Sequence, residues 1–352
     1  MRRSDLGGGG LGGVMLNFWS ERAPLLSTNR QRQARLKLVL FPPVFLLDVM
    51  PKEYRQVSWD PQLVDDCRYL IRLAFREDLD NEQDWSTVSL VAADAQGSAD
   101  IAARDSGTLA GVQVIPLIIE EAELDLVWTP QKQDGDSIQC GDVIGNLQGN
   151  VRDLLTSERT ILNFVCRLTG IATLTRRYVD AATGQARVYD TRKTTPGWRR
   201  LEKYAVQCGG GVNHRVGLYA AVMAKDNHLA WSATQRTLAD ITPQVREFLV
   251  AQLGEAGAAE KLIEVEVDSL QQLEAVLPSQ PDIILLDNMP PEVLRQAVEM
   301  RNRLAPQVEL EASGGVNLQT IGPISASGVE RVSVGALTHG AVSLDLGLDW
   351  KS

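Results

Sequence analysis

Charged, polar or glycine-rich clusters follow six short runs of apolar and β-branched residues in the second half of the chain. The clusters are DTRKT (190–194), KDNH (225–228), EVD (266–268), DN (287–288), SGG (313–315) and GA (335–336). Parallel β/α barrels place catalytic groups at the carboxyl ends of their strands. One charged strand end is unremarkable, but six in succession predict an active site rather than a set of solvated loops.

The first cluster opens a basic stretch, residues 190–225. It holds seven Lys or Arg and two acids in a chain of net charge −10. Arg binds carboxylate or phosphate in a planar, bidentate way, and Lys adds a compact charge. Arg192 and Lys193 stand at a strand end, so we expect them to contact a polyanionic ligand. Three basic residues of a helical stretch are expected on its surface instead: Arg199, Arg200 and Lys203.

Two isolated carboxylates follow this stretch. Glu264 and Glu266 alternate with β-branched residues and therefore point to the same face of one strand. Glu266 lies nearer the strand's end, and Asp287 ends the next run. Two carboxylates that face a phosphate ligand at a barrel mouth suggest Mg²⁺ or hydrogen bonds to sugar hydroxyls. For Glu264, a buried ion pair with a Lys or Arg of a neighbouring strand is the open alternative.

Glycine-containing segments follow the last two strand-like runs. They comprise Ser313, Gly314 and Gly315, and then Gly335 and Ala336. The last two loops of a β/α barrel often bind phosphate through backbone N–H groups, and glycine lets the backbone approach closely. Their position predicts a phosphate site.

The same half of the chain alternates strand-like with helix-like segments. Strands are expected at residues 187–189, 221–224, 262–267, 283–286, 308–311 and 331–334, and helices at 241–253, 270–277, 291–304 and 318–325. This alternation predicts a parallel sheet, and the number of units suggests a small or incomplete β/α barrel. An open doubly wound sheet is the alternative, although no G-x-G-x-x-G opens a helix after a strand.

The preceding part mixes helices with a sheet of antiparallel character. A helix capped by Asp60 is expected from Pro61, another at 117–124, and strands at 98–109 and 143–149. A long helical region covers 153–180, and we expect Gly170 to divide it. The predicted organisation is an α/β domain at 56–160, with the tail 339–352 packing on it, and a barrel at 161–338.

Composition narrows the class of protein. A net charge of −10 argues against binding to nucleic acid or to an anionic membrane. Four widely spaced cysteines without a CxxC pair predict free thiols and a reducing cytoplasm. The apolar run 38–49 contains two prolines and is too short to span a bilayer as a helix. With a membrane span disfavoured, we expect residues 1–55 to be a disordered extension. An over-extended gene start before Met50 is a further interpretation.

Eight segments, in order along the chain, resemble the quinolinate phosphoribosyltransferase family. They are LLTSERTILN (154–163), RLTGIAT (167–173), DTRKTTPG (190–197), CGGGVNHR (208–215), KDNH (225–228), EVEV (264–267), LLDN (285–288) and GALTH (335–339). The resemblance covers residues 63–344. It implies an N-terminal α/β sandwich and an incomplete, seven-stranded barrel. It also implies transfer of phosphoribose from phosphoribosyl pyrophosphate to quinolinate, with decarboxylation to nicotinate mononucleotide, in NAD biosynthesis.

The resemblance also implies roles for individual residues. Substrate contacts fall on Thr191, Arg192, His214, Arg215 and Lys225, of which the last four hold the two carboxylates of quinolinate. Lys193 bridges quinolinate and the phosphoribosyl donor, and with Glu266 and Asp287 it forms the implied catalytic set. The same two acids bind the ribose hydroxyls and Mg²⁺.

Further implied contacts involve the phosphate and a second subunit. Two loops hold the 5′-phosphate, with the residues Ser313, Gly314, Gly315, Val334, Gly335 and Ala336. The family forms homodimers or assemblies of dimers with shared sites, and Arg159 reaches into the site of the partner subunit.

Two departures from the family's pattern stay open at this point. The turn at 80–87 keeps only Asp84, Ser86 and Thr87 of the usual pattern, and Trp198 replaces a smaller apolar residue. Three classes of rival function also stay open. They are a nicotinate-type phosphoribosyltransferase or a divergent quinolinate-like protein with another role, a Schiff-base aldolase that uses Lys193 or Lys225, and a non-catalytic metabolite-binding protein.

Overall fold

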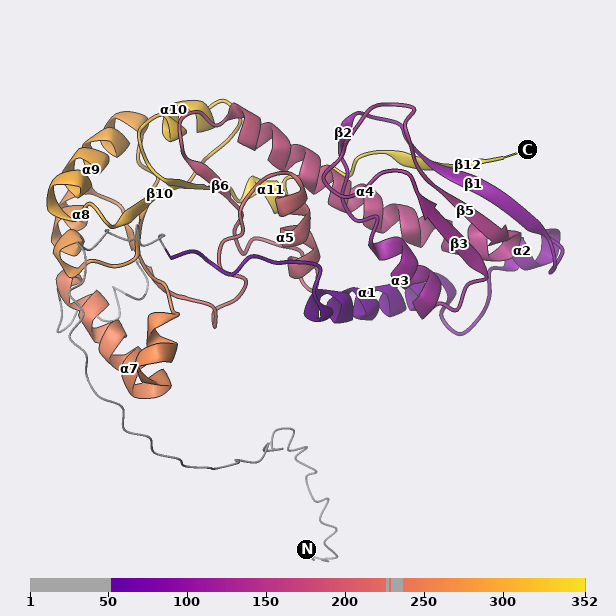
Figure 1. The fold of residues 1–352 in the computed structure, drawn as a ribbon, viewed down its shortest axis with the longest axis horizontal. Helices are drawn as coiled ribbons and strands as arrows, with labels where there is room; N and C mark the ends of the chain where they lie inside the picture. The colour runs from indigo at the N-terminus through magenta and orange to yellow at the C-terminus, as the bar shows by residue number, and fades with distance from the viewer. Residues whose placement is uncertain (1–51, 226–227, 229–236, 352) are drawn as a thin grey trace, which may run out of the picture. The chain divides into compact units, whose positions relative to one another are not determined.

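The computed structural model describes residues 52–225, 228 and 237–351. They belong to one compact unit, Pro51–Ser352, and a second unit comprises Met1–Met50. The expectations for residues 1–51 therefore lie outside the described residues. Within the described part, a four-stranded sheet has the order β12-β1-β5-β3, a six-stranded sheet has the order β6-β11-β10-β9-β8-β7, and β2 pairs with β4 (Figure 1). No helix of the described part combines the length and hydropathy that a bilayer span requires.

The four-stranded sheet is antiparallel throughout. Its strands are β1 (Gln96–Ala103), β3 (Leu126–Pro130), β5 (Val143–Asn150) and β12 (Leu346–Trp350). Short strands β2 (Gly107–Thr108) and β4 (Ser137–Ile138) and helices α1 (Pro61–Leu79), α2 (Trp85–Leu90) and α3 (Val114–Glu121) accompany it. The segment expected as one strand at 98–109 is thus two strands, β1 and β2. The expected helix at 117–124 begins and ends three residues earlier.

Local capping explains where the first helices begin. The Asp60 side chain accepts a hydrogen bond from Leu63 N (2.9 Å), and Pro61 follows at the first helical position. The carboxylate of Asp84 accepts from Thr87 N (3.0 Å) and caps α2 in the same way. The loop that departs from the family's pattern therefore still starts a helix.

Helix α4 (Val151–Ala181) connects the two large sheets, since it contacts β5, β12 and β6. The expected division at Gly170 is wrong, because α4 is continuous over 31 residues. A Cβ at Gly170 would lie 2.1 Å from the carbonyl oxygen of Val342. The glycine therefore admits a crossing chain that bonds to the helix from Leu344 N to Cys166 O (3.0 Å).

The six-stranded sheet is parallel. It consists of β6 (Arg187–Tyr189), β7 (Val222–Ala224), β8 (Ile263–Val267), β9 (Ile283–Asp287), β10 (Glu309–Ser313) and β11 (Arg331–Ser333). The order runs from β7 to β11 without reversal and then to β6, so this is an incomplete barrel and not a doubly wound sheet. The resemblance implied seven strands. The described residues give six, and a parallel bridge from Tyr189 to Val212 extends the β6 edge.

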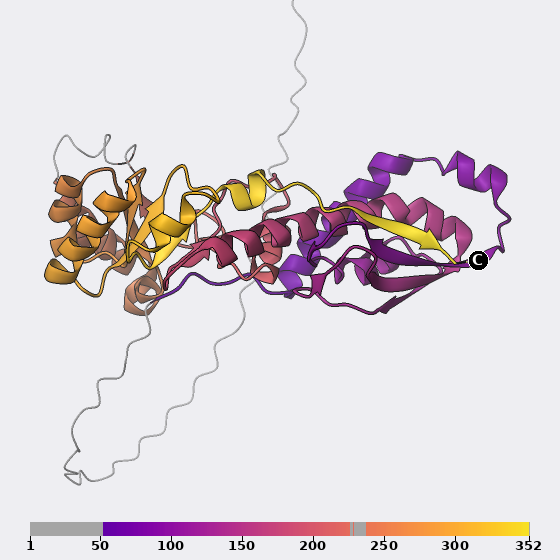
Figure 2. The same cartoon turned by 90° about the horizontal axis from the view of Figure 1, so that it is seen from above.

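Helices surround the parallel strands. They are α5 (Arg199–Cys208), α7 (Ile241–Ala259), α8 (Leu270–Val276), α9 (Pro291–Leu304), α10 (Ile321–Ser325) and α11 (Ala336–His339), with the 3-10 turns η1 (Leu238–Asp240) and η2 (Leu277–Ser279). Helices α8 and α9 lie outside the strands (Figures 1 and 2), and their Leu273 and Leu294 are buried in the main core.

The two faces of the barrel strands differ in chemistry. The outward residues are apolar and packed in the core, as Val265, Ile284 and Leu310 illustrate, and each such side chain stabilises the fold by about 1.5–3 kcal/mol. The inward residues of β8 and β10 are largely acidic. The alternation of each strand therefore places an apolar surface under the helices and charges inside the barrel.

Candidate active site

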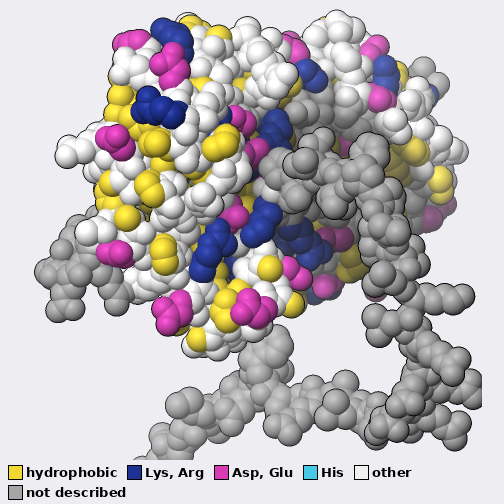
Figure 3. All heavy atoms as spheres, turned by 60° about the vertical axis from the view of Figure 1, so that its left-hand side comes forward, with side chains coloured by type: hydrophobic (Ala, Val, Ile, Leu, Met, Phe, Trp, Pro, Cys, Tyr) yellow, Lys and Arg dark blue, Asp and Glu magenta, His cyan; other side chains and the backbone are white. Residues whose placement is uncertain are grey.

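A cavity of about 660 Å³ lies at the carboxyl ends of the parallel strands. Most of its lining comes from residues at or just beyond a strand end. The lining residues are Thr191, Arg192, Lys193, His214, Arg215, Met223, Lys225, Glu266, Leu285, Asp287, Asn288, Glu311, Ser313, Gly314, Gly315 and Ser333. The face in Figure 3 shows Lys and Arg side chains gathered in a hollow beside acidic ones.

The structure brings together eleven of the fifteen residues that the sequence assigned to the site. The four that do not line the cavity are Arg159, Val334, Gly335 and Ala336. Arg159 is exposed on α4. Gly335 lies against the Lys193 side chain, since a Cβ there would be 3.0 Å from Lys193 Cδ. Ser333 lines the cavity in place of Val334, which is buried.

The outer part of the cavity, here named the mouth, is rich in cations. It comprises Arg192, Lys193, Lys225, Glu266 and Asp287. Lys225 Nζ lies 2.5 Å from Glu266 Oε2. Among the described residues, Arg192 and Lys193 form no ion pair, and Arg192 Nε is buried without a hydrogen-bond partner. Two cations at the mouth are thus available to an anionic ligand.

Local geometry fixes the strand end that carries Asp287. Asn288 adopts a left-handed conformation (φ 54°), its N donates to Ser313 O (2.8 Å), and its Nδ2 donates to Asp287 Oδ2 (2.8 Å). Gly314 (φ 91°) passes so close that a Cβ would meet Asn288 Oδ1 at 2.2 Å. Glycine is therefore required here, and the loop after β10 is held against the loop after β9.

A buried ion pair supports the strand end that carries Arg192. Lys203 and Asp190 are both fully buried and paired with each other, so the expectation that Lys203 lies on the helix surface is wrong. Lys203 Nζ also donates to His214 O (2.9 Å), and Asp190 accepts from His214 N (2.8 Å). Burial raises the pKa of Asp190 and lowers that of Lys203, and their mutual attraction opposes both shifts. The pair joins β6 to the loop that carries His214.

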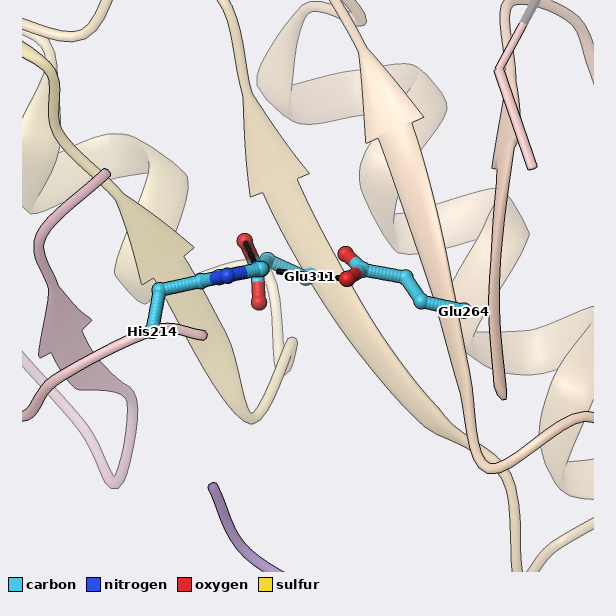
Figure 4. Close-up of side chains that lie close together, drawn as sticks. All are labelled: His214, Glu264 and Glu311. Carbon is cyan, nitrogen blue, oxygen red and sulfur yellow. Dashed lines mark ion pairs between the residues drawn. The ribbon is translucent and has the colours of Figure 1, made fainter. Parts of the chain in front are cut away.

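Below the mouth, three side chains from separate elements meet (Figure 4). His214 comes from the loop after α5, Glu264 from β8 and Glu311 from β10, and all three are buried. His214 Nε2 lies 3.2 Å from Glu264 Oε2 and 3.4 Å from Glu311 Oε1. Glu264 is thus in a buried pair, as one interpretation of the sequence held, but its partner is a histidine and not a Lys or Arg.

The protonation of His214 bears on whether this cluster could hold a metal. Burial disfavours the imidazolium, but Glu264 and Glu311 outweigh it and raise the pKa of His214 to about 9. Arg215 N donates to His214 Nδ1 (2.8 Å), which opposes a proton on that nitrogen. Nε2 therefore keeps its proton in the neutral and the charged ring alike. Because a metal would need the Nε2 lone pair, the arrangement favours hydrogen bonding over metal binding.

Deeper in the barrel a buried guanidinium gathers three carboxylates. Arg331 lies 3.0 Å (Nε) from Glu311 Oε2, 2.9 Å (Nη1) from Glu309 Oε2 and 3.1 Å (Nη2) from Glu53 Oε1. Its guanidinium carbon is 3.9 Å from the ring centroid of Tyr189. We name this layer the floor; it comprises Glu53, Arg187, His214, Glu264, Glu309, Glu311 and Arg331.

The floor corrects one boundary drawn from the sequence. The predicted disordered extension includes residues 52–55, yet Glu53 pairs with Arg331, and Tyr54 is buried with its hydroxyl 2.6 Å from Glu264 Oε2. Residues that sequence reasoning missed include Glu311, Asn288 and Ser333, which all line the cavity. The alternation Glu309-Leu310-Glu311 repeats that of Glu264-Val265-Glu266, and this signal could have identified Glu311.

Comparison with known proteins identifies the family and the fold. A family model described as the C-terminal domain of quinolinate phosphoribosyl transferase matches residues 171–349, and the corresponding N-terminal domain matches residues 84–169. The chain belongs to the quinolinate phosphoribosyltransferase family. It is therefore an enzyme that transfers phosphoribose.

Curated relatives and solved structures agree with this membership. The chain is 43% identical over 288 residues to a carboxylating nicotinate-nucleotide pyrophosphorylase of Mycobacterium leprae, which covers 81% of this chain and 97% of that protein. A probable enzyme of the same name from Bacillus subtilis is 38% identical over 71% of this chain and 82% of its own length. The solved structure of the nicotinate-nucleotide pyrophosphorylase from Francisella tularensis superposes with a TM-score of 0.75 at 32% identity, covering 85% of this chain and 100% of that one.

Proposed function

We propose that the mouth is where this quinolinate phosphoribosyltransferase joins its two substrates and releases pyrophosphate and carbon dioxide, leaving nicotinate mononucleotide. The observation that carries the proposal is the set of unpaired cations beside two carboxylates in one cavity of about 660 Å³. Quinolinate is a dianion and the phosphoribosyl donor is a polyanion. The mouth offers the charges that both substrates need in a single space.

Quinolinate lies against Arg192, Arg215 and Lys225, with His214 beneath it. The Arg192 Nε proton has no partner in the described chain, and Arg215 is buried at the cavity wall, so both guanidinium groups can bind carboxylates. Thr191 lies beside them in the lining and adds a hydroxyl contact. These cations also stabilise the negative charge that develops when the ring loses carbon dioxide.

The donor lies across Lys193 and the two acids. Lys193 is exposed in the mouth and reaches both substrates. Glu266 and Asp287 line the same cavity and accept hydrogen bonds from ribose hydroxyls. Carboxylates stabilise the oxocarbenium-like transition state of transfer at C1′, and the ring nitrogen is the nucleophile, so no general base is needed.

Magnesium fits this donor set. Mg²⁺ is usually held by one or two carboxylates together with water and substrate oxygens, and Asp287 and Glu266 provide these two. Bound there, Mg²⁺ neutralises charge on the departing pyrophosphate. Glu266 Oε2 already accepts a hydrogen bond from Lys225 Nζ (2.5 Å). Asp287 is therefore the acid with more freedom to bind the ion.

The loop after β10 receives the 5′-phosphate. Ser313, Gly314 and Gly315 line the cavity with a hydroxyl and backbone held in positive-φ conformations. Val334, Gly335 and Ala336 belong to the next loop, in which Gly335 lies against the Lys193 side chain, and we expect them to hold the same phosphate. Successive backbone N–H groups in such turns bind anions.

A second copy of the chain completes the site. Arg159 is exposed and does not line the cavity of its own chain, so a homodimer that shares its sites explains its position. We expect Arg159→Ala and Lys193→Ala chains, inactive alone, to regain about a quarter of the wild-type activity in a 1:1 mixture, because about half of the dimers are then heterodimers and each heterodimer has one intact site. Absence of recovery despite heterodimer formation contradicts the shared site.

We place the enzyme in the cytoplasm. All four of its cysteines are free, as is usual in reducing compartments. Neither nucleic acid nor a membrane is a partner in this proposal, because the chain's net charge of −10 repels anionic polymers and lipids.

One assay tests the reaction. The purified chain is incubated with quinolinate and phosphoribosyl pyrophosphate, and pyrophosphate and carbon dioxide are measured. We expect release of both that requires each substrate and stops when a chelator removes Mg²⁺. Turnover of nicotinate instead of quinolinate overturns the proposal in favour of a nicotinate-type enzyme, and a borohydride-trapped adduct on Lys193 or Lys225 does so in favour of a Schiff-base mechanism.

A further inference from the structure

The segment of residues 53–57 precedes both regions matched by the family, which begin at residue 84. It is extended and lacks regular secondary structure. Even so, Tyr54 and Val57 are 4% and 2% exposed, which is unusual for a segment that leads into a first helix. Its contacts go to the part of the chain that carries two residues of the substrate site.

Gln56 and Val57 bind the residue next to His214 at several points. Asn213 N donates to Gln56 Oε1 (2.7 Å), and Gln56 Nε2 donates to Asn213 O (3.1 Å). Val57 N donates to Asn213 Oδ1 (2.9 Å). Asn213 is completely buried, so these bonds replace water at its backbone and its side chain. The segment thus fixes the peptide that carries His214 and Arg215.

Tyr54 approaches His214 from below. Its ring centroid lies 4.4 Å from that of His214, and its hydroxyl donates to Glu264 Oε2 (2.6 Å). The same carboxylate oxygen lies 3.2 Å from His214 Nε2. Tyr54 therefore limits where both the imidazole and its carboxylate partner can lie.

Glu53 anchors the segment to the barrel. Its carboxylate lies 2.7 Å from Arg187 Nη1 and 3.1 Å from Arg331 Nη2, and it accepts from Tyr189 Oη (2.5 Å). Neighbouring Arg55 is different, because its side chain is 88% exposed and only approaches Asp60 at 3.8 Å. The segment thus contains buried anchoring residues and one exposed residue that serves as an internal control.

We propose that Tyr54 and Gln56 are positioning residues for the substrate site, which fix residues 213–215 so that His214 and Arg215 face quinolinate. The inference rests on the function proposed above. Neither residue touches substrate. Their effect reaches the ligand through Glu264 and Asn213, so it concerns the binding of quinolinate rather than of the phosphoribosyl donor.

The test uses full-length Tyr54→Phe, which removes the hydroxyl and keeps the ring. Without the hydrogen bond from the Tyr54 hydroxyl, the Glu264 carboxylate positions His214 less well. We therefore expect the KM for quinolinate to rise about five- to tenfold. We expect kcat and the KM for phosphoribosyl pyrophosphate to change less than twofold. Arg55→Ala tests the same segment without a buried contact, because the Arg55 side chain is 88% exposed, and it is expected to keep wild-type KM values.

A spectroscopic readout separates positioning from general loss of structure. The chain has three histidines, so selective ¹⁵N labelling gives few signals, and loss of one signal in His214→Gln assigns it. In Tyr54→Phe we expect the His214 Nε2 resonance to shift while the other two stay in place. Should Tyr54→Phe fail to fold, Gln56→Ala, which removes the acceptor of Asn213 N, is expected to give the same KM change.

The outcomes distinguish this inference from the proposed function. If the wild-type chain does not use quinolinate, the function is wrong, whatever the variants do. If it does, and Tyr54→Phe and Gln56→Ala keep the wild-type KM for quinolinate and an unshifted His214 resonance, the positioning role is wrong. An equal fall in activity toward both substrates also contradicts it, since that result indicates general damage.

Discussion

The mouth and the floor of the barrel contain the same types of charged residue. They differ in how far these charges are paired with each other. In the mouth, Arg192 and Lys193 form no ion pair within the described chain, and Lys225 shares one with the partly exposed Glu266. In the floor, the fully buried Arg331 pairs with three carboxylates. The two layers are linked, because Glu311 contacts both Arg331 and His214 and also lines the cavity.

Solvent explains the difference. A charge removed from water must be paired, or its desolvation costs several kcal/mol. In the mouth, Lys193 and Lys225 remain exposed to water, so their charges cost little without a ligand, whereas Arg192 Nε is buried and has no partner among the described residues. Arg331, Glu264 and Glu311 of the floor are fully buried, so their charges must be compensated within the protein, whereas Arg187 and Glu53 keep 37% and 27% of their side chains exposed. Variants of the mouth should therefore change activity and leave stability intact, whereas variants of the floor should change stability.

The largest expected effect is that of Arg192→Ala on activity. Losing a bidentate, charge-assisted contact with quinolinate removes about 3–4 kcal/mol, and we expect kcat/KM for quinolinate to fall about 10²- to 10³-fold in steady-state assays. Thermal unfolding should be unchanged, because the guanidinium has no internal ion partner. Arg200→Ala is the matched control, since Arg200 pairs with Asp66 outside the cavity. A stability loss in Arg192→Ala that matches its activity loss would remove the distinction between mouth and floor.

Next in size is the effect of Glu311→Gln on stability. This change leaves Arg331 with one fewer buried counter-charge but keeps its pairs with Glu309 and Glu53, so we expect the free energy of unfolding to fall by about 2–3 kcal/mol, less than the loss for a buried charge left without any partner. Urea denaturation followed by circular dichroism measures it. Glu120→Gln, whose side chain is 66% exposed in its pair with Arg68, is the control and should leave the midpoint in place. If the Glu311→Gln chain is as stable as wild type, the ion pairs of the floor do not contribute to the stability of the fold.

The smallest expected effect on stability is that of Glu266→Gln. Glu266 lies on β8 two residues after Glu264, which belongs to the floor. Its partner Lys225 is 41% exposed, so the pair contributes below about 1 kcal/mol to unfolding. Activity should nevertheless fall and the Mg²⁺ requirement should rise, which a titration of Mg²⁺ at fixed substrate measures. Comparison with Glu264→Gln on the same strand sharpens the contrast, because we expect that buried variant to lose stability. Equal losses in the two variants contradict the assignment of Glu266 to the mouth.

Much of the fold followed from local patterns. The six parallel strands lie within a residue or two of the expected segments, because β-branched runs bounded by polar clusters are a direct consequence of burial on one face or both. The expectation that failed at Gly170 followed from helix propensity alone. A glycine costs a helix about 1 kcal/mol, and here the approach of Val342 gives it a packing role that no local pattern contains.

The sequence by itself determined which residue types stand at the strand ends, and from these it predicts an anion-binding site at the carboxyl end of a parallel barrel. It could not determine which of these charges are paired. The sequence predicts Arg192 at a strand end and Lys203 on a helix surface, yet Lys203 is fully buried in a pair with Asp190, while Arg192 lines the cavity as expected. Likewise, nothing in the pattern of residues 53–57 reveals that Tyr54 meets Glu264, 210 positions away. Charge compensation depends on distance in space, and only the closed barrel sets those distances.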